Sequence, residues 1–138
     1  MTKNDCDLIE SNTTQELFSE TFLGKIVLSA SLKGFSIRPM LKFQPNILLK
    51  DKDNLSDYGI NASIVSLPGH TNGSIGVDVD NKYLIVGDAL MNMFYPTLSM
   101  LFHNKKEMLT SARKISNIGK RIIYFGHGKP IPNKRWVK

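Results

Sequence analysis

Two histidines and one aspartate, His70, Asp88 and His127, each come just past a run of apolar residues, and a glycine immediately precedes each of them. Glycine permits backbone angles that other residues avoid, so the chain can turn there and aim the side chain away from a sheet. Taken singly, such a histidine is a turn or packing residue, and such an aspartate is a helix cap or loop acid. If the three apolar runs are strands of one sheet, with the ends that precede His70, Asp88 and His127 aligned, the side chains can converge. Imidazole and carboxylate together suit Zn, and also Fe or Mn.

A β-hairpin is expected to bring His70 and Asp88 to the same end of the sheet. Two β-rich segments, 74–79 and 82–87, flank the two-residue turn signal Asp80-Asn81. A two-residue turn sets the register and puts four of the apolar residues on one face. In that register the facing pairs are Val79 with Lys82, Val77 with Leu84, Ile75 with Val86 and Gly73 with Asp88, and the shared face holds Ile75, Val77, Leu84 and Val86.

Two helices and one further strand complete the expected elements. Apolar spacing and the capping box Thr13-x-x-Glu16 predict a helix from about Thr14 to Leu32, which Gly34 would end. A second helix is expected to open at Asn104-Lys105-Lys106-Glu107 and to close at Gly119. The run 121–125 reads as a short buried strand that ends at His127.

The segment between the first helix and the hairpin is less regular. Pro39 and Pro45 interrupt any element there, and Ile47 to Lys50 is a candidate for a short strand. The charged stretch Asp51-Lys52-Asp53-Asn54 predicts a turn.

Three motifs together carry a resemblance to a known family. Pro68-Gly69-His70-Thr71-x-Gly73-Ser74, Gly87-Asp88-Ala89-Leu90 and Gly126-His127-Gly128 resemble, in order and spacing, the third, fourth and fifth motifs of the metallo-β-lactamase superfamily. The resemblance covers the chain from about Ile60 onward. It implies an α/β fold, half of an αβ/βα sandwich with a mostly antiparallel sheet and flanking helices.

The resemblance also implies roles for the three residues. His70 would hold a first metal, Asp88 would bridge two metals, and His127 would hold the second. In the family a metal-bound hydroxide attacks an ester, thioester, lactam or phosphodiester bond, depending on the branch.

One departure from the family weakens the expectation of activity. The family carries a His-x-His-x-Asp-His stretch upstream, whereas the histidines of this chain are His70, His103 and His127. We therefore expect residues 1–138 to form one truncated domain, a remnant or fragment of a metal-dependent hydrolase that is weak or inactive alone. Zn, or Fe or Mn, would be bound weakly, at no more than about one ion per chain, or not at all. The alternative is a non-catalytic interaction module that kept the scaffold.

The stretch after Asp88 is rich in methionine and aromatic residues. It begins beside the expected site, and flexible methionine with flat aromatic surfaces suits adaptable binding of a small molecule. The simpler alternative is that this stretch packs as a loop and helix start beneath the sheet. The candidates for a substrate pocket are Met91, Met93, Phe94 and Tyr95, with His103 at its rim.

The distribution of charge and the expected missing half bear on whether the partner is a nucleic acid or another protein chain. The net charge is +6, but the basic residues are spread over the chain, apart from a terminal group at Lys129, Lys134, Arg135 and Lys138. Solvated lysines explain that distribution, so we expect no nucleic-acid partner. Loss of half a sandwich would expose an apolar face, and a homo-oligomer is the simplest cover for it.

The single cysteine and the lack of long apolar runs bear on the compartment. Cys6 excludes an internal disulfide within this chain and fits a reducing environment. No apolar stretch approaches the ~20 residues of a membrane span, so we expect no membrane anchor. The sequence therefore predicts a cytoplasmic protein.

Overall fold

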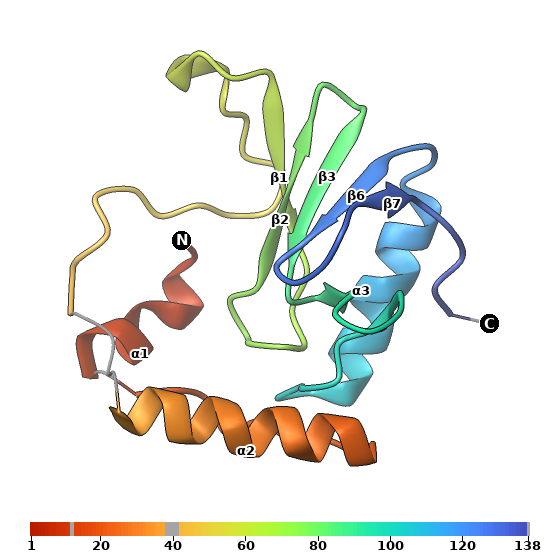
Figure 1. Cartoon of the computed structure of the whole chain (residues 1–138). Coiled ribbons are helices and arrows are strands. Elements are labelled where there is room, and N and C mark those ends of the chain that lie inside the picture. Colours follow the sequence, from red (N-terminus) through yellow and green to blue (C-terminus); the bar gives the residue numbers. More distant parts are fainter. Residues whose placement is uncertain (12, 38–41, 138) are drawn as a thin grey trace.

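The computed structural model describes residues 1–11, 13–37 and 42–137, and the predictions made for Pro39 and Lys138 lie outside these residues. A five-stranded sheet has the order β1-β2-β3-β6-β7, in which only the β3–β6 pair is parallel (Figure 1). The predicted α/β class with a mostly antiparallel sheet is therefore confirmed. The strands are β1 Ala62–Ser66, β2 Ile75–Val79, β3 Tyr83–Gly87, β6 Ile122–Phe125 and β7 Ile131–Pro132; the short strands β4 Leu90–Met91 and β5 Thr97–Leu98 pair separately.

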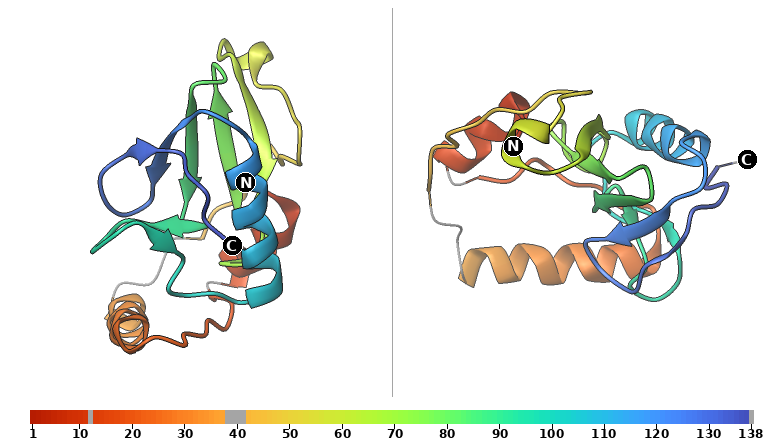
Figure 2. Two further views of the ribbon diagram at one scale, coloured as in Figure 1. Left: turned by 90° about the vertical axis from the view of Figure 1, so that its right-hand side faces the viewer. Right: turned by 90° about the horizontal axis from the view of Figure 1, so that it is seen from above.

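The two longest helices, α2 and α3, lie at different places around the sheet. Helix α3, Lys105–Asn117, is the crossover between β3 and β6 and packs against one face of the sheet (Figure 2). Helix α2, Phe22–Ile37, lies beyond one end of the strands (Figure 1). The remaining helical elements are η1 Lys3–Asp5, α1 Cys6–Ser11 and η2 Ser56–Tyr58.

The hairpin of β2 and β3 forms, but its register is one residue away from the predicted one. Asp80 and Asn81 both have φ of 53°, and the Lys82 N–H donates to the Val79 carbonyl at 2.9 Å, so the two-residue turn is present. Lys82 is an extra residue after the turn, and Tyr83 instead pairs with Val79. A shift of one residue moves side chains to the opposite face. The predicted shared face of Ile75, Val77, Leu84 and Val86 is therefore wrong.

The face of the sheet that packs on α3 forms the core. Leu84 and Val86 on β3 are almost fully buried, with Ile123 beside them on β6 and Ala112 and Ile115 above them on α3. Burial of a side chain of this size stabilises the fold by about 1.5–3 kcal/mol. The register shift places Asp78 opposite Leu84 on this face. A charged residue therefore enters the core.

Asp78 is 8% exposed and is paired with a single arginine. Arg121 donates from Nε to Oδ1 at 2.9 Å and from Nη2 to Oδ2 at 3.0 Å. This two-point contact satisfies a carboxylate that would otherwise lie uncompensated beside apolar residues. It also connects β2 to the start of β6 across the intervening strand.

The opposite face over β3 and β6 stays open. Tyr83, Ile85 and Tyr124 are 41%, 46% and 40% exposed there, although their side chains are large and mostly apolar. Tyr83 and Tyr124 stack edge to face at 6.1 Å between ring centroids. We call this group of three side chains the open face.

Helix α3 begins and ends as its sequence predicts. The Asn104 side chain accepts the Glu107 N–H at 3.2 Å, which caps the first turn. The helix stops at Asn117, and Gly119 follows with φ of 90°.

Helix α2 departs from its prediction at both ends. It begins at Phe22, where the Thr21 hydroxyl accepts the Gly24 N–H at 3.0 Å, and it continues past Gly34 to Ile37. The predicted start at Thr14 is wrong because contacts with distant segments hold the preceding residues extended. Phe18, for example, pairs through its backbone with Phe102.

The segment before β1 matches its prediction in part. No strand forms over Ile47–Lys50, where the Leu49 N–H donates to the Met1 carbonyl at 2.8 Å. The turn predicted at Asp51–Asn54 is present, with φ of 70° at Lys52.

Helix α2 remains largely exposed. Its only buried residue is Gly24, while Phe22, Ile26 and Leu32 are 78%, 51% and 54% exposed. Across the described residues, none of the helices is both long and apolar enough to span a bilayer.

Candidate metal site

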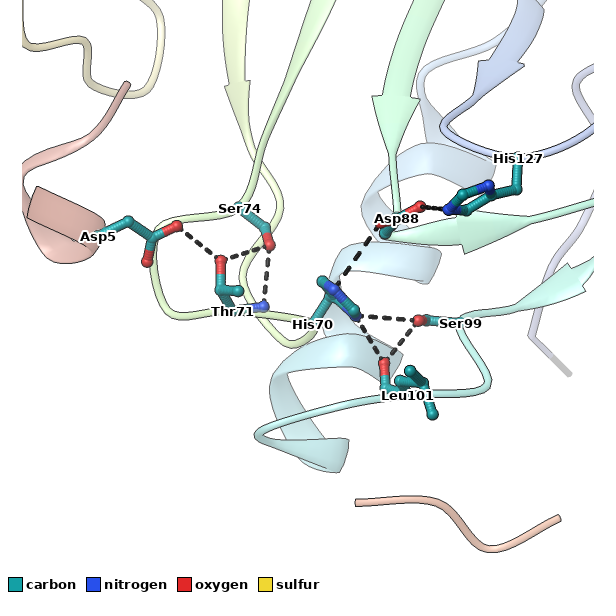
Figure 3. A network of polar contacts seen from close by, with 8 residues as sticks. All are labelled: Asp5, His70, Thr71, Ser74, Asp88, Ser99, Leu101 and His127. Atoms are coloured by element: carbon teal, nitrogen blue, oxygen red, sulfur yellow. Dashed lines mark hydrogen bonds and ion pairs between the residues drawn. The ribbon is translucent and has the colours of Figure 1, made fainter. Parts of the chain in front are cut away.

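The three predicted residues emerge together at one end of the sheet. His70 lies in the loop between β1 and β2, Asp88 directly follows β3, and His127 follows β6. Because β3 and β6 are parallel neighbours, their carboxyl ends meet at the same edge. His70 Nε2 lies 3.9 Å from Asp88 Oδ2, and His127 Nε2 lies 3.7 Å from Asp88 Oδ1 (Figure 3). The structure thus brings the three side chains together around the aspartate.

The ring of His70 is held from behind. Its Nδ1 lies 2.9 Å from the Leu101 carbonyl oxygen, which can only accept, so Nδ1 carries a hydrogen and, in the neutral ring, Nε2 presents the lone pair (Figure 3). The Ser99 hydroxyl donates to the same carbonyl at 2.6 Å. The side chain is 17% exposed, and Nε2 faces Asp88. A backbone carbonyl on the far nitrogen is the usual support of a metal-binding histidine.

Asp88 presents a carboxylate oxygen that its surroundings leave unsatisfied. Among the described residues, Oδ1 is buried and has no hydrogen-bond partner. Gly126 packs directly against this oxygen, and a Cβ at that position would collide with it. A buried carboxylate oxygen without a donor is costly unless a cation or a proton compensates it.

His127 is the most open of the three, with its side chain 54% exposed. Its loop is fixed by Asn92, whose N–H donates to the His127 carbonyl at 3.0 Å and whose side-chain amide donates to the Lys129 carbonyl at 2.7 Å. Gly128 between these carbonyls has φ of 106°, and a side chain there would collide with Asn92. The backbone is therefore constrained, while the imidazole faces solvent.

The donor types suit a metal, but the three side chains do not form a closed ligand group. Donors around one zinc ion lie about 2.0–2.2 Å from it, which brings neighbouring donors to within about 3.5 Å of each other. The two histidine–aspartate separations, 3.7 and 3.9 Å, are slightly longer, and they involve different oxygens. Within residues 1–11, 13–37 and 42–137 no group of three or more His, Cys, Asp and Glu side chains is arranged to hold an ion. The unsatisfied Asp88 oxygen and the free Nε2 of His70 nevertheless fit a cation.

The residues predicted for a substrate pocket occupy different environments. Met91 is 2% exposed in β4, whereas Met93, Phe94 and Tyr95 are 40%, 58% and 52% exposed. His103 Nδ1 bonds to the Glu16 carbonyl at 2.8 Å, away from the cluster around Asp88. A substrate role for these residues remains a prediction.

A cavity of about 220 Å³ opens beside His70 on the side of α1. Leu8, Ile9 and Leu17 contribute apolar walls, and His70 and Thr71 line it as well. No sequence pattern indicates this cavity, because residues more than fifty positions apart form it.

Supporting residues around the site carry no sequence signal either. The Leu101 carbonyl is a backbone group, so the residue type does not indicate that it bonds to His70. Asn92 lies between two methionines, and its partners are 35 or more positions away. Asp5, which bonds to the loop of His70, is 66 residues from Thr71.

Comparison with known proteins finds similar folds among solved structures. No protein-family model matches the chain, and no curated protein matches it. Among solved structures, a metallo-beta-lactamase family protein from Thermus thermophilus aligns with 98% of this chain and 48% of its own, at 18% identity and a TM-score of 0.66. An archaeal metallo-beta-lactamase superfamily protein from Sulfolobus tokodaii aligns with 80% of this chain and 46% of its own, at 15% identity and a TM-score of 0.61.

A third similar structure is the B3 metallo-beta-lactamase BLEG-1, at 27% identity and a TM-score of 0.57. The alignment covers 72% of this chain and 51% of the other. The resemblance predicted from the three motifs is thus confirmed at the level of the fold. The chain has the metallo-β-lactamase fold, and it spans about half the length of the solved chains that it matches.

Proposed function

We propose that this chain contributes one half of the metal site of a metal-dependent hydrolase, and that it is weak or inactive when assayed alone. The observation that supports the proposal is the meeting of His70, Asp88 and His127 at one sheet end, with a buried Asp88 oxygen that lacks a partner among the described residues. A bound Zn, Fe or Mn ion would supply a Lewis acid and a water of lowered pKa for attack on an ester, thioester, lactam or phosphodiester bond.

Each side chain has its own part in this proposal. His70 would bind through Nε2, because the Leu101 carbonyl holds the hydrogen on Nδ1. Asp88 would add negative charge between the two imidazoles. His127 would supply the second imidazole, from a more exposed side chain whose backbone Asn92 fixes.

The open face supports the idea of a half site. Tyr83, Ile85 and Tyr124 have the size and polarity of residues that pack beneath a second layer, yet they are 40% exposed or more. Neighbouring exposed side chains of this size can mark an interface. In this proposal the remaining ligands and the cover for this face come from the same additional half, either in the same protein or in another chain.

Metal binding tests the proposal. We would titrate the chain with Zn²⁺ against a chromophoric chelator and repeat the titration with His70→Ala, His127→Ala and Asp88→Asn. His103→Ala is the matched control, because the ring of this third histidine bonds to Glu16, whereas its contact with the His70 loop runs through the backbone N–H, which alanine retains. We expect no more than about one labile ion per chain. Affinity should fall about tenfold or more in the three site variants and remain unchanged in the control.

Two results would contradict the proposal. Equal affinity in the chain and all four variants would mean that the cluster binds no metal. Two ions per chain retained after dialysis would mean that the described cluster is not a half site.

A second candidate function, a non-catalytic interaction module, is favoured by one observation. Helix α2 exposes Phe22, Ile26 and Leu32, and its only charged residues are Lys25 and Lys33. Residues 1–20, in contrast, hold five acidic side chains and a single lysine. In this candidate function a second copy covers α2, with the acidic segment of one copy opposite the basic helix of the other. A cytoplasmic location belongs to both candidates and is supported by the single cysteine.

A further inference from the structure

We propose that Asp5 is a positioning residue that fixes the loop of His70 in the orientation that aims its ring at Asp88. The proposal concerns the loop Pro68–Ser74, and it rests on the proposed function only where His70 is taken as a metal ligand. Asp5 belongs to η1 and therefore reaches the loop from the far end of the sequence. Figure 3 shows its carboxylate directed at Thr71.

Both oxygens of the Asp5 carboxylate bond to the loop. Oδ1 accepts the Gly73 N–H at 2.8 Å, and Oδ2 accepts the Thr71 hydroxyl at 2.8 Å. The Thr71 hydroxyl also lies 2.9 Å from the Ser74 hydroxyl, which accepts the Thr71 N–H at 3.0 Å. Hydrogen bonds to a charged group are each stronger than neutral ones. One carboxylate thus fixes the loop at the positions one and three residues after His70.

The lack of a side chain at Gly73 permits its close contact with Asp5. It is buried, and a Cβ at this position would collide with the carboxylate of Asp5 and the hydroxyl of Thr2. The Thr2 hydroxyl donates to the Gly73 carbonyl at 3.0 Å, so both backbone groups of the glycine are satisfied from the N-terminal segment. The small residue and the carboxylate therefore fit as a pair.

The other side of the loop is attached to a different segment. The His103 N–H donates to the carbonyls of Gly69 and His70, at 2.8 and 3.2 Å, and the His70 ring bonds to Leu101. Asp5 holds the loop after His70, and the segment Leu101–His103 holds it before and at His70. With the Asp5 carboxylate removed, the loop after His70 keeps the contacts of Thr2 with the Gly73 carbonyl and of Gln15 with the Asn72 N–H. Among the described residues, Thr71 then has no hydrogen-bond partner outside the loop, and the direction of the adjacent His70 ring is less restricted.

Asp5→Ala tests this role, with Asp7→Ala as a matched control. Asp7 lies two residues away and is exposed, and its side chain makes no hydrogen bond to the described loop. Asp5→Asn keeps an oxygen for the Gly73 N–H and an amide that can donate to Thr71, so it should rescue most of the effect. Thr71→Val removes the hydroxyl that donates to Asp5 Oδ2, so it breaks the second contact by a change in the loop and leaves Asp5 in place.

Two measurements report on the ring. The first is the ¹⁵N chemical shift of the His70 ring nitrogens in the metal-free chain at about pH 8.5, which gives the population of each tautomer. We expect the Nδ1–H form to dominate in the chain, in Asp7→Ala and in Asp5→Asn. It should fall toward the free-imidazole mixture in Asp5→Ala, with a partial fall in Thr71→Val. The second is Zn²⁺ affinity, which should weaken about tenfold in Asp5→Ala.

An unchanged His70 tautomer in folded Asp5→Ala would overturn the proposal. If Asp5→Ala does not fold, Thr71→Val decides in its place, and an unchanged tautomer there has the same consequence. If the unmodified chain binds no Zn²⁺, the proposed function fails, while the tautomer measurement still decides the role of Asp5.

Discussion

The buried pair of Asp78 and Arg121 gives the sharpest test of how this fold is stabilised. The two side chains are 9% and 14% exposed, and removal of one partner from such a pair costs about 3–5 kcal/mol because a charge is left uncompensated. The two single variants should not cost the same. After Asp78→Ala, Arg121 still bonds to Asn81 and to the Lys120 carbonyl, at 3.0 and 2.9 Å, so we expect about 3 kcal/mol or less.

After Arg121→Ala, Asp78 has no other hydrogen-bond donor among the described residues and faces Leu84. We expect a loss of about 4–5 kcal/mol in the free energy of unfolding, out of the roughly 5–15 kcal/mol that a domain typically has. The double variant Asp78→Leu, Arg121→Met removes both charges and should return to within about 2 kcal/mol of the unmodified chain.

Urea unfolding followed by Trp136 fluorescence measures these differences, since this side chain packs against the core through Phe125. Arg113→Ala, on the exposed side of α3, is the control and should change stability by no more than about 0.5 kcal/mol. A larger loss in Asp78→Ala than in Arg121→Ala would refute the reasoning, and so would a double variant less stable than both single ones.

Three further expectations concern pH, assembly and activity. The pKa of Asp51 is lowered from 3.8, first by the Ser66 N–H and then by Lys114, so its stabilisation is present above about pH 4 and lost as pH falls through the lowered value. The difference in unfolding free energy between the chain and Asp51→Asn should therefore shrink below about pH 4; a constant difference would contradict this. Light scattering at micromolar concentration should show a dimer or larger species, and Ile26→Glu on α2 should reduce it; a monomer stable to dilution would contradict the interaction module. Assays with added Zn, Mn or Fe against lactam, thioester, lactone and phosphodiester substrates should show no turnover above free metal; robust turnover lost in His70→Ala would mean that a second chain supplies ligands.

The local parts of the fold were predictable from the sequence because their signals are local. Asn104 and Gly119 mark the two ends of α3, and both act as their residue types suggest. The motif around His70 and the glycines at 87 and 126 indicated the fold, and the comparisons confirm it. Each of these signals lies within a few residues of the feature that it determines.

The errors came from contacts between distant segments. Lys82 looks like the first residue of β3, but its carbonyl accepts the Ile122 N–H at 2.8 Å, and the strand pairs one residue later. The capping box at Thr13 and Glu16 is real as a pattern, yet the Glu16 carbonyl bonds to His103 instead of beginning a helix. A local pattern cannot reveal that a partner 87 positions away will compete for the same backbone.

The parallel pairing of β3 and β6 also determines when the site can form during folding. Residues 88–121, which include α3, form the loop that closes when β3 and β6 meet, and closing a loop costs entropy that only the pairing repays. Long-range parallel pairs are accordingly slow steps. Asp88 and His127 therefore become neighbours only when this crossover closes. A probe of the distance between these two side chains would therefore report closure of the crossover, separately from formation of the local β2–β3 hairpin.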